Sequence, residues 1–213
     1  MKTDALIDRL SDAAPQPSRG EVVRTLFIGL GAGTLVSALA MLFWLGVRPD
    51  IEAAMRTGAY WMKFSYTLLF ALAGFWTVER LSRPGAASRG QMVLEALPFA
   101  LLASWAAMRL MMAPAPMRMP MMMGHSAHVC PWRIAILALP IFAGAFWSLR
   151  RLAPTRPAIA GLAAGLAAGA LGAFVYAFHC DESAAPFVAL WYTFGIGLVG
   201  LAGAVLGRFL LRW

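Results

Sequence analysis

The run AIAGLAAGLAAGALGAFVYAF occupies residues 158–178 and contains no charged side chain. A helix of this length crosses the apolar core of a bilayer, which takes about 20 residues. A strand of an outer-membrane barrel would alternate lipid-facing and polar residues over about 10 positions, and the sequence shows no such alternation. The run therefore predicts a membrane-spanning helix and an all-α fold.

Five further apolar runs flank this one, and each is long enough for a spanning helix. The run at 134–149 is short, but residues 130–132 extend its start. Together the runs predict an all-α, polytopic membrane protein with six transmembrane helices. The expected spans cover residues 22–47, 60–78, 92–112, 134–149, 158–178 and 185–211.

The composition supports this class and excludes others. Hydrophobic residues make up 61% of the chain and charged residues 13%, against about 45–50% and about 25% in soluble domains. Two cysteines are too few for a disulfide-rich secreted scaffold. The net charge is +8, but the basic residues are spread between apolar runs, so we expect no direct nucleic-acid binding. The sequence has no phosphate-binding glycine loop, nucleophile elbow or HExxH motif, and we expect no enzyme activity.

The distribution of Lys and Arg predicts the orientation, because these residues favour the cytoplasmic side of a membrane. With the N-terminus inside, twelve of the 18 Lys and Arg residues fall on the inner side. We therefore expect both termini in the cytoplasm. Residues 1–21 then form a cytoplasmic N-terminal segment for binding a partner, and residues 22–213 form a six-helix transmembrane domain.

The N-terminal segment carries the pattern of a short amphipathic helix. Thr3 suits an N-cap and Asp4 the first turn. A helix of about ten residues is marginal alone in water, so its apolar stripe fits the groove of a partner. A helix lying on the membrane surface, or a disordered tail, is the alternative. The stripe consists of Leu6, Ile7 and Leu10.

All three histidines and both cysteines fall on the predicted outer side. His125, His128 and Cys130 precede the fourth span, whereas His179 and Cys180 follow the fifth. The two connections face the same compartment if six helices cross the membrane. Because Pro131 follows Cys130, the cysteine is expected in the first turn of a helix, where the helix dipole favours a thiolate.

The connection before Cys130 is rich in methionine, and its three prolines, Pro114, Pro116 and Pro120, are expected to keep it out of a helix. Thioethers and thiolates select soft metal ions such as Cu(I). Three interpretations of the outer residues are open. One is a structural disulfide between Cys130 and Cys180. Another is a sensor in which the two thiols meet copper, another soft metal ion or an oxidant. The third is that these residues have no joint role; in no case do we expect an obligatory cofactor.

Gly161, Gly165 and Gly169 repeat every four residues along the fifth span. Small residues on one helix face let two backbones approach closely within the membrane. We expect this stripe to pack against another helix of the same chain. Homodimerisation is the alternative, and the sequence leaves the oligomeric state open.

Several short motifs resemble the NrsF family of membrane anti-sigma factors, which are negative regulators of extracytoplasmic-function sigma factors. The likeness covers nearly the whole chain and includes the six spans. Its motifs are TDALIDRL at 3–10, the pair Cys130 and Pro131, and C-x-E-S-x-x-x-F-x-x-x-W at 180–191.

This resemblance implies a protein of the bacterial inner membrane whose cytoplasmic N-terminus holds an extracytoplasmic-function sigma factor away from RNA polymerase. Asp4, Leu6, Ile7 and Leu10 would face the sigma factor, and Cys130 and Cys180 would perceive heavy-metal stress. The Met- and His-rich loop lies outside the family motif and favours copper as the signal. The alternative function is a small membrane metal transporter or metal-handling protein. It would need a polar pathway through the bilayer centre, which the expected spans lack.

Overall fold

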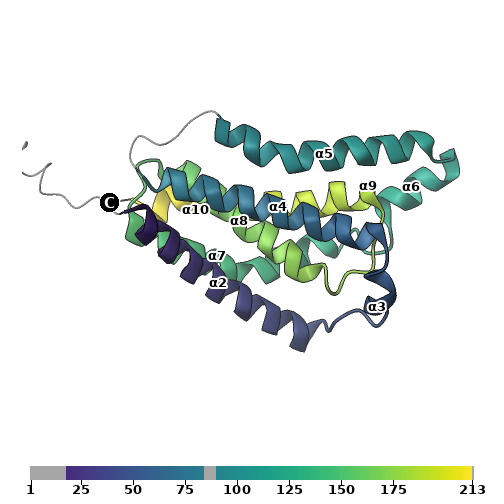
Figure 1. The fold of residues 1–213 in the computed structure, drawn as a ribbon, viewed down its shortest axis with the longest axis horizontal. Coiled ribbons are helices and arrows are strands. Elements are labelled where there is room, and N and C mark those ends of the chain that lie inside the picture. Colours follow the sequence, from purple (N-terminus) through teal and green to yellow (C-terminus); the bar gives the residue numbers. More distant parts are fainter. Residues whose placement is uncertain (1–17, 84–89, 213) are drawn as a thin grey trace, which may run out of the picture.

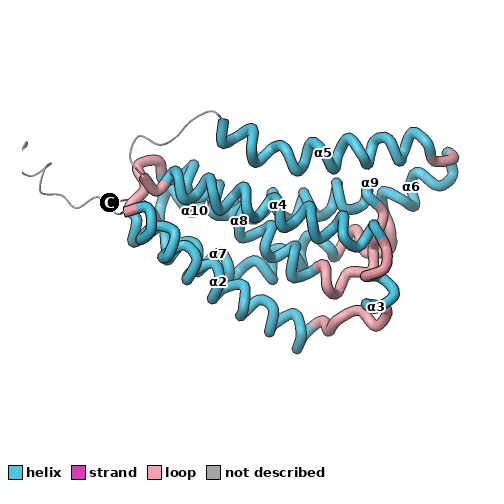
Figure 2. Tube along the Cα trace, in the orientation of Figure 1, coloured by secondary structure: helices cyan, strands magenta, loops and turns pink. Residues whose placement is uncertain are grey.

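The computed structural model describes residues 18–83 and 90–212, and these residues are almost entirely helical, with no strand among them (Figure 2). The all-α fold is therefore confirmed. A π-helical turn over Val188–Tyr192 joins α9 to α10. In chain order the helices are α2 (Arg19–Trp44), α3 (Ile51–Ala54), α4 (Gly58–Leu81), α5 (Gly90–Met112), α6 (Ala115–Met123), α7 (Cys130–Leu152), α8 (Pro157–Tyr176), α9 (Ala185–Phe187) and α10 (Thr193–Leu210).

Five of the described helices are long and apolar enough to cross a membrane, and they coincide with five of the six expected spans. The helix at 130–152 confirms that residues 130–132 extend the short fourth run. The remaining expected span, 60–78, lies within α4. This helix has 24 residues but carries Lys63 near its start and Glu79 and Arg80 near its end. The five candidate spans are Arg19–Trp44, Val93–Met112, Cys130–Leu152, Pro157–Tyr176 and Ala185–Leu210.

Helix α8 lies at the centre of the bundle, where it packs against α4, α7 and α10 (Figure 1). Its small residues allow this. A Cβ atom at Gly161 would overlap the carbonyl oxygen of Gly203, and one at Gly165 would overlap that of Val199. A Cβ atom at Gly169 would lie 3.0 Å from the backbone of Ile196, a less severe contact. The glycine stripe thus lies against α10 of the same chain.

A second close contact joins α2 to α7. A Cβ atom at Gly29 would overlap the backbone of Gly144, and one at Gly33 would overlap that of Ile141. The hydroxyl of Ser148 donates a hydrogen bond of 2.9 Å to the carbonyl of Thr25. Because such contacts leave little room for independent movement, α2 is held firmly to α7.

The methionine-rich connection is a helix, contrary to the sequence expectation. α6 covers Ala115–Met123 even though it contains Pro116 and Pro120. Pro116 lies in the first turn, where the missing N–H has no intrahelical partner to lose. Pro120 lies in the second turn and leaves the carbonyl of residue 116 without its usual N–H partner. Three prolines in ten residues therefore did not exclude a short surface helix.

The two ends of the bundle differ in what they carry (Figure 1). Helix α2 begins and α10 ends at the same end. The opposite end holds α3, α6 and α9, together with the loops around Cys130 and Cys180, and we call it the thiol end. Helix α2 begins at Arg19, where the side chain of Ser18 accepts a hydrogen bond of 3.2 Å from the backbone of Glu21. The start of α2 and the two cysteines are therefore separated by the length of the bundle.

Candidate functional site

Cys130 and Cys180 lie next to one another at the thiol end, although 50 positions separate them in the sequence. Cys130 is the first residue of α7, and its N–H donates a 2.9 Å hydrogen bond to the carbonyl of Ser126. Cys180 follows the end of α8, and its N–H donates a 3.0 Å bond to the carbonyl of Tyr176. Both side chains are buried, and both are free thiols.

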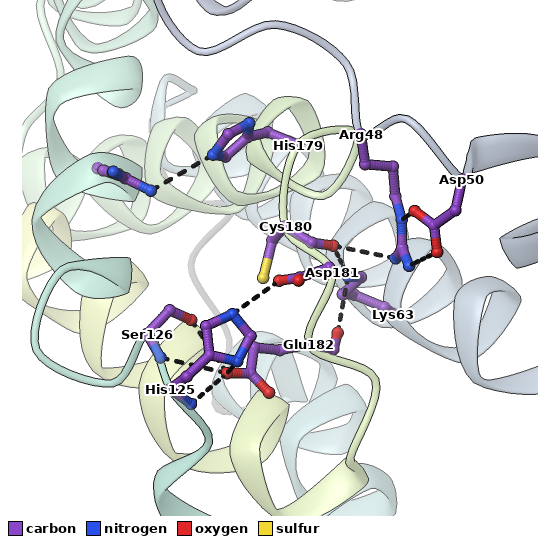
Figure 3. Close-up of polar contacts among 10 residues, drawn as sticks. Arg48, Asp50, Lys63, His125, Ser126, His179, Cys180, Asp181 and Glu182 are labelled. Carbon is purple, nitrogen blue, oxygen red and sulfur yellow. Dashed lines mark hydrogen bonds and ion pairs between the residues drawn. The ribbon is translucent and has the colours of Figure 1, made fainter.

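Two cations hold the backbone beside Cys180 (Figure 3). The ammonium group of Lys63 donates hydrogen bonds to the carbonyls of Cys180, at 2.6 Å, and Glu182, at 2.9 Å. Arg48 donates to the same Cys180 carbonyl at 3.3 Å and pairs with Asp50 at 2.7 Å. Its backbone N–H also bonds the carbonyl of Phe178 at 3.1 Å. The segment that carries Cys180 is thus fixed to α4 and to the loop after α2.

The carboxylate of Glu182 joins this segment to the loop before Cys130 (Figure 3). It accepts hydrogen bonds from the backbone N–H groups of His125, at 2.7 Å, and Ser126, at 3.2 Å. It also lies 3.0 Å from the Nδ1 atom of the His125 ring. A Cβ atom at Gly124 would overlap the same carboxylate, and Gly124 has a φ of 51°, so a side chain is excluded there. Glu182 therefore fixes the two cysteine-bearing loops to each other.

The surroundings favour a negative charge on the sulfur of Cys180. Taken together, the surrounding groups lower the pKa of Cys180 to about 6, and the neighbouring Cys130 thiol makes the largest contribution. The positive charge of Lys63, the hydroxyl of Tyr192 and the backbone of Glu182 also lower that pKa, whereas burial opposes them. A thiolate is the form that reacts with electrophiles and oxidants. Cys180 is thus the more reactive sulfur of the pair.

An open pocket of about 750 Å³ leads to Cys180 from the surface of the thiol end. Arg48, His125 and Arg133 line it together with Cys180, whereas Cys130 does not. Of the two cysteines, Cys180 is therefore the one that borders open space.

The histidines do not join the two thiols. His179 donates from Nδ1 to the carbonyl of Gly46 at 3.0 Å and accepts at Nε2 from Arg133 at 3.3 Å. His125 pairs with the carboxylates of Asp181 and Glu182, and His128 is exposed. Within 18–83 and 90–212, no group of three or more His, Cys, Asp or Glu residues is placed to hold a metal ion. Other partners hold two of the imidazoles, and the joint metal- or redox-sensing role expected for His125, His128, His179, Cys130 and Cys180 stays a prediction.

The residues expected to bind a partner, Asp4, Leu6, Ile7 and Leu10, lie outside the described residues. Sequence reasoning also missed two of the groups that organise the thiol pair, Lys63 and Glu182. For Lys63, one signal was available in the sequence, because it is the only charged residue in the apolar run at 60–78. For Glu182, the sequence carried no signal beyond its place in the motif at 180–191.

Comparison with known proteins identifies the family. The family described as negative regulator of sigma F, NrsF, matches residues 10–213. The chain belongs to the NrsF family. It is 39% identical to the anti-sigma-F factor NrsF of Caulobacter vibrioides and 38% identical to the probable anti-sigma-F factor NrsF of Azospira oryzae, and each alignment covers the whole of both chains. No solved structure matches.

Membership of the NrsF family confirms the resemblance drawn from the sequence motifs. The family match begins at residue 10 and so includes Leu10 but not Asp4, Leu6 or Ile7. It also includes both cysteines, Lys63 and Glu182.

Proposed function

We propose that this NrsF-family chain is a membrane-bound anti-sigma factor. Its N-terminal segment, residues 1–21, binds an extracytoplasmic-function sigma factor at the inner membrane and keeps it from RNA polymerase. The observation that carries the proposal is the full-length identity of 39% to the anti-sigma-F factor NrsF of Caulobacter vibrioides. The apolar stripe of Leu6, Ile7 and Leu10 supplies a surface suited to a partner's groove.

The proposed topology has six spans, with α4 as the second, and both termini in the cytoplasm. Two observations support it. The start of α2 and the end of α10 share one end of the bundle (Figure 1). That end also carries exposed arginines on four helices, as expected of a cytoplasmic face. These arginines are Arg19, Arg24, Arg80, Arg150, Arg151 and Arg208.

The thiol pair is the proposed signal site, facing the periplasm. A thiol-directed signal, an oxidant or a soft metal ion, acts on Cys180 and Cys130 and changes how α7 and the end of α8 pack. Helix α7 carries Cys130 at its start and contacts α2 through Gly144 and Ser148 near its other end. Since α2 begins at Arg19, at the end of the N-terminal segment, a shift of α7 reaches the segment that holds the sigma factor.

The energy needed for this switch is small. A signal shifts an equilibrium only by its differential affinity for the two states. A tenfold change in sigma-factor release takes about 1.4 kcal/mol. A change in packing around two buried sulfur atoms can supply a free-energy difference of this size.

The first experiment tests partner binding. The detergent-solubilised chain is used to retain proteins from a cell extract, with and without its first 15 residues. We expect the full chain to retain a sigma factor and the truncated chain to retain none. Retention of the same sigma factor by the truncated chain would contradict the N-terminal binding site.

The second experiment tests the signal site. We replace Cys130 and Cys180 with serine and follow sigma-dependent transcription with and without cadmium, copper or diamide. We expect sigma-dependent transcription to rise under at least one of these agents in cells with the wild-type chain. In cells with the double variant, we expect none of the agents to raise it. An unchanged response in the double variant would eliminate the thiol pair as the signal site.

A further inference from the structure

Lys63 is an unusual residue for the interior of this bundle. Its side chain is 1% exposed, and α4 places it among apolar and aromatic neighbours. Its ammonium group donates to the carbonyls of Cys180 and Glu182 and lies 5.9 Å from the centre of the Tyr192 ring. Among the ion pairs of the described residues, none joins Lys63 to a carboxylate. The charge of Lys63 is therefore buried against dipoles and a ring rather than against an acid.

Such burial is costly, because a buried charge needs an opposite charge or full hydrogen bonding to replace its water. A neutral side chain of the same length would fill the space without that cost. The contacts of Lys63 suggest a role for its charge. Lys63 binds the backbone of the segment that carries the sulfur of Cys180. A thiolate at Cys180 is the negative charge that Lys63 is placed to balance.

We propose that Lys63 is the positioning residue of the thiol pair: its ammonium group fixes the carbonyls of Cys180 and Glu182 and thereby holds the Cys180 sulfur beside Cys130. This inference rests on the proposed function only in taking the thiol pair as the signal site. The same contact brings a positive charge close to Cys180, since the charge of Lys63 lowers the pKa of that thiol. Lys63 thus sets both the place and the reactivity of one sulfur.

The arrangement assigns different parts to the two cysteines. Cys180 borders the open pocket and has the cation beside it, so it meets an incoming reagent first. Cys130 is wholly buried at the start of α7 and supplies the neighbouring thiol. The ionisable or charged groups around Cys180, taken from every element packed on it, are Lys63, Arg48, Arg133, Cys130, Tyr176, Tyr192, His125, His179, Asp181 and Glu182.

The test compares the reactivity of the two cysteines in the full-length, detergent-solubilised chain. Reduced protein is treated with iodoacetamide between about pH 5 and pH 9, and the fraction alkylated at each cysteine is measured by mass spectrometry. The variants are Lys63→Met, which removes the charge, Lys63→Gln, which keeps a hydrogen-bond donor, and Lys63→Arg, which keeps both. Arg118→Met is the matched control, because Arg118 is exposed and, among the described residues, its side chain bonds only the carbonyl of Ala113.

In the wild-type chain we expect Cys180 to react before Cys130, with a midpoint near pH 6. In Lys63→Met and Lys63→Gln the midpoint should rise by about one pH unit, and the preference for Cys180 should fall. Lys63→Arg should keep most of the wild-type behaviour, and Arg118→Met should keep all of it. A merely structural lysine would change the melting temperature of the variants but not this pH profile.

Unchanged midpoints in Lys63→Gln and Lys63→Met would overturn the inference. If Lys63→Met is not recovered as folded protein, the contrast between Lys63→Gln and Lys63→Arg decides in the same way, because equal profiles in those two would contradict a role for the charge. The measurement uses neither a sigma factor nor a cell. If the transcription experiment showed no role for the thiols, the alkylation result for the Lys63 variants would still stand. Failure of the proposed function and failure of this inference are therefore distinguishable.

Discussion

At the scale of single residues, the thiol site depends on an asymmetry between two like side chains. Cys130 is placed by the start of a helix, whereas Cys180 is placed by a loop that Lys63, Arg48 and Glu182 hold from three sides. The second position gathers several groups that stabilise a negative sulfur, namely Lys63, Tyr192 and the backbone of Glu182. The pair therefore contains one nucleophile and one neighbouring thiol rather than two equivalent ligands.

This asymmetry predicts a pH dependence of stability. The pKa of Cys180 is lowered to about 6 from its ordinary value of 9.0, and the neighbouring Cys130 thiol is the largest cause. A group whose pKa is lowered on folding stabilises the fold above its unfolded pKa, and that contribution is lost as the pH falls through its folded pKa. Relative to Cys180→Ser, we expect the reduced wild-type chain to be most stable near pH 9 and to lose that advantage towards pH 6. Thermal unfolding in detergent across this range measures the difference, and a constant difference would contradict a lowered pKa.

At the scale of elements, close backbone contacts determine which helices move together. Gly161 and Gly165 bring α8 against α10, and Gly29 and Gly33 bring α2 against α7. Helix α5 packs mainly along α4 and α9 and lies at the edge of the bundle (Figure 1). The contacts that connect the thiol end to the start of α2 therefore run through α7 and α8 rather than α5.

The contact between α8 and α10 gives a direct test of this packing. Gly161→Ala would place a methyl group on the carbonyl of Gly203, so the two helices must separate. We expect a loss of stability of about 1–3 kcal/mol, the usual cost of overpacking. Gly197→Ala is the matched control, because its added Cβ atom meets nothing within 4 Å. Denaturation of the two variants in detergent measures the difference, and equal stabilities would show that α8 and α10 pack less closely than described.

Much of the fold was predictable from the sequence, because it follows from local patterns. Uninterrupted apolar runs predicted α8 and α10, and Cys130 followed by Pro131 predicted the start of α7. The helix at α6 was not predictable from its prolines, since their cost depends on their position within the turn. The role of Lys63 was hidden because its two acceptors lie 117 and 119 positions further along the chain. Tertiary contacts of this range leave no periodic trace in a sequence.

In the molecule as a whole, the bundle separates the proposed signal site from the proposed partner-binding segment. The thiol pair lies at one end, and the chain that leads to the N-terminal segment enters at the other (Figure 1). The family match and the five long apolar helices among the described residues are compatible with a membrane protein. Under the proposed function, a signal on one side of the bilayer and a partner on the other require a change in helix packing to connect them.

Labelling with a membrane-impermeant maleimide tests this separation most directly. In a chain whose own cysteines are replaced by serine, a single cysteine is introduced by Ser183→Cys, at an exposed position of the thiol end, or by Thr3→Cys, in the N-terminal segment. In spheroplasts, we expect Ser183→Cys to react from outside and Thr3→Cys to react only after the membrane is permeabilised. Reaction of both variants from the same side would contradict the account.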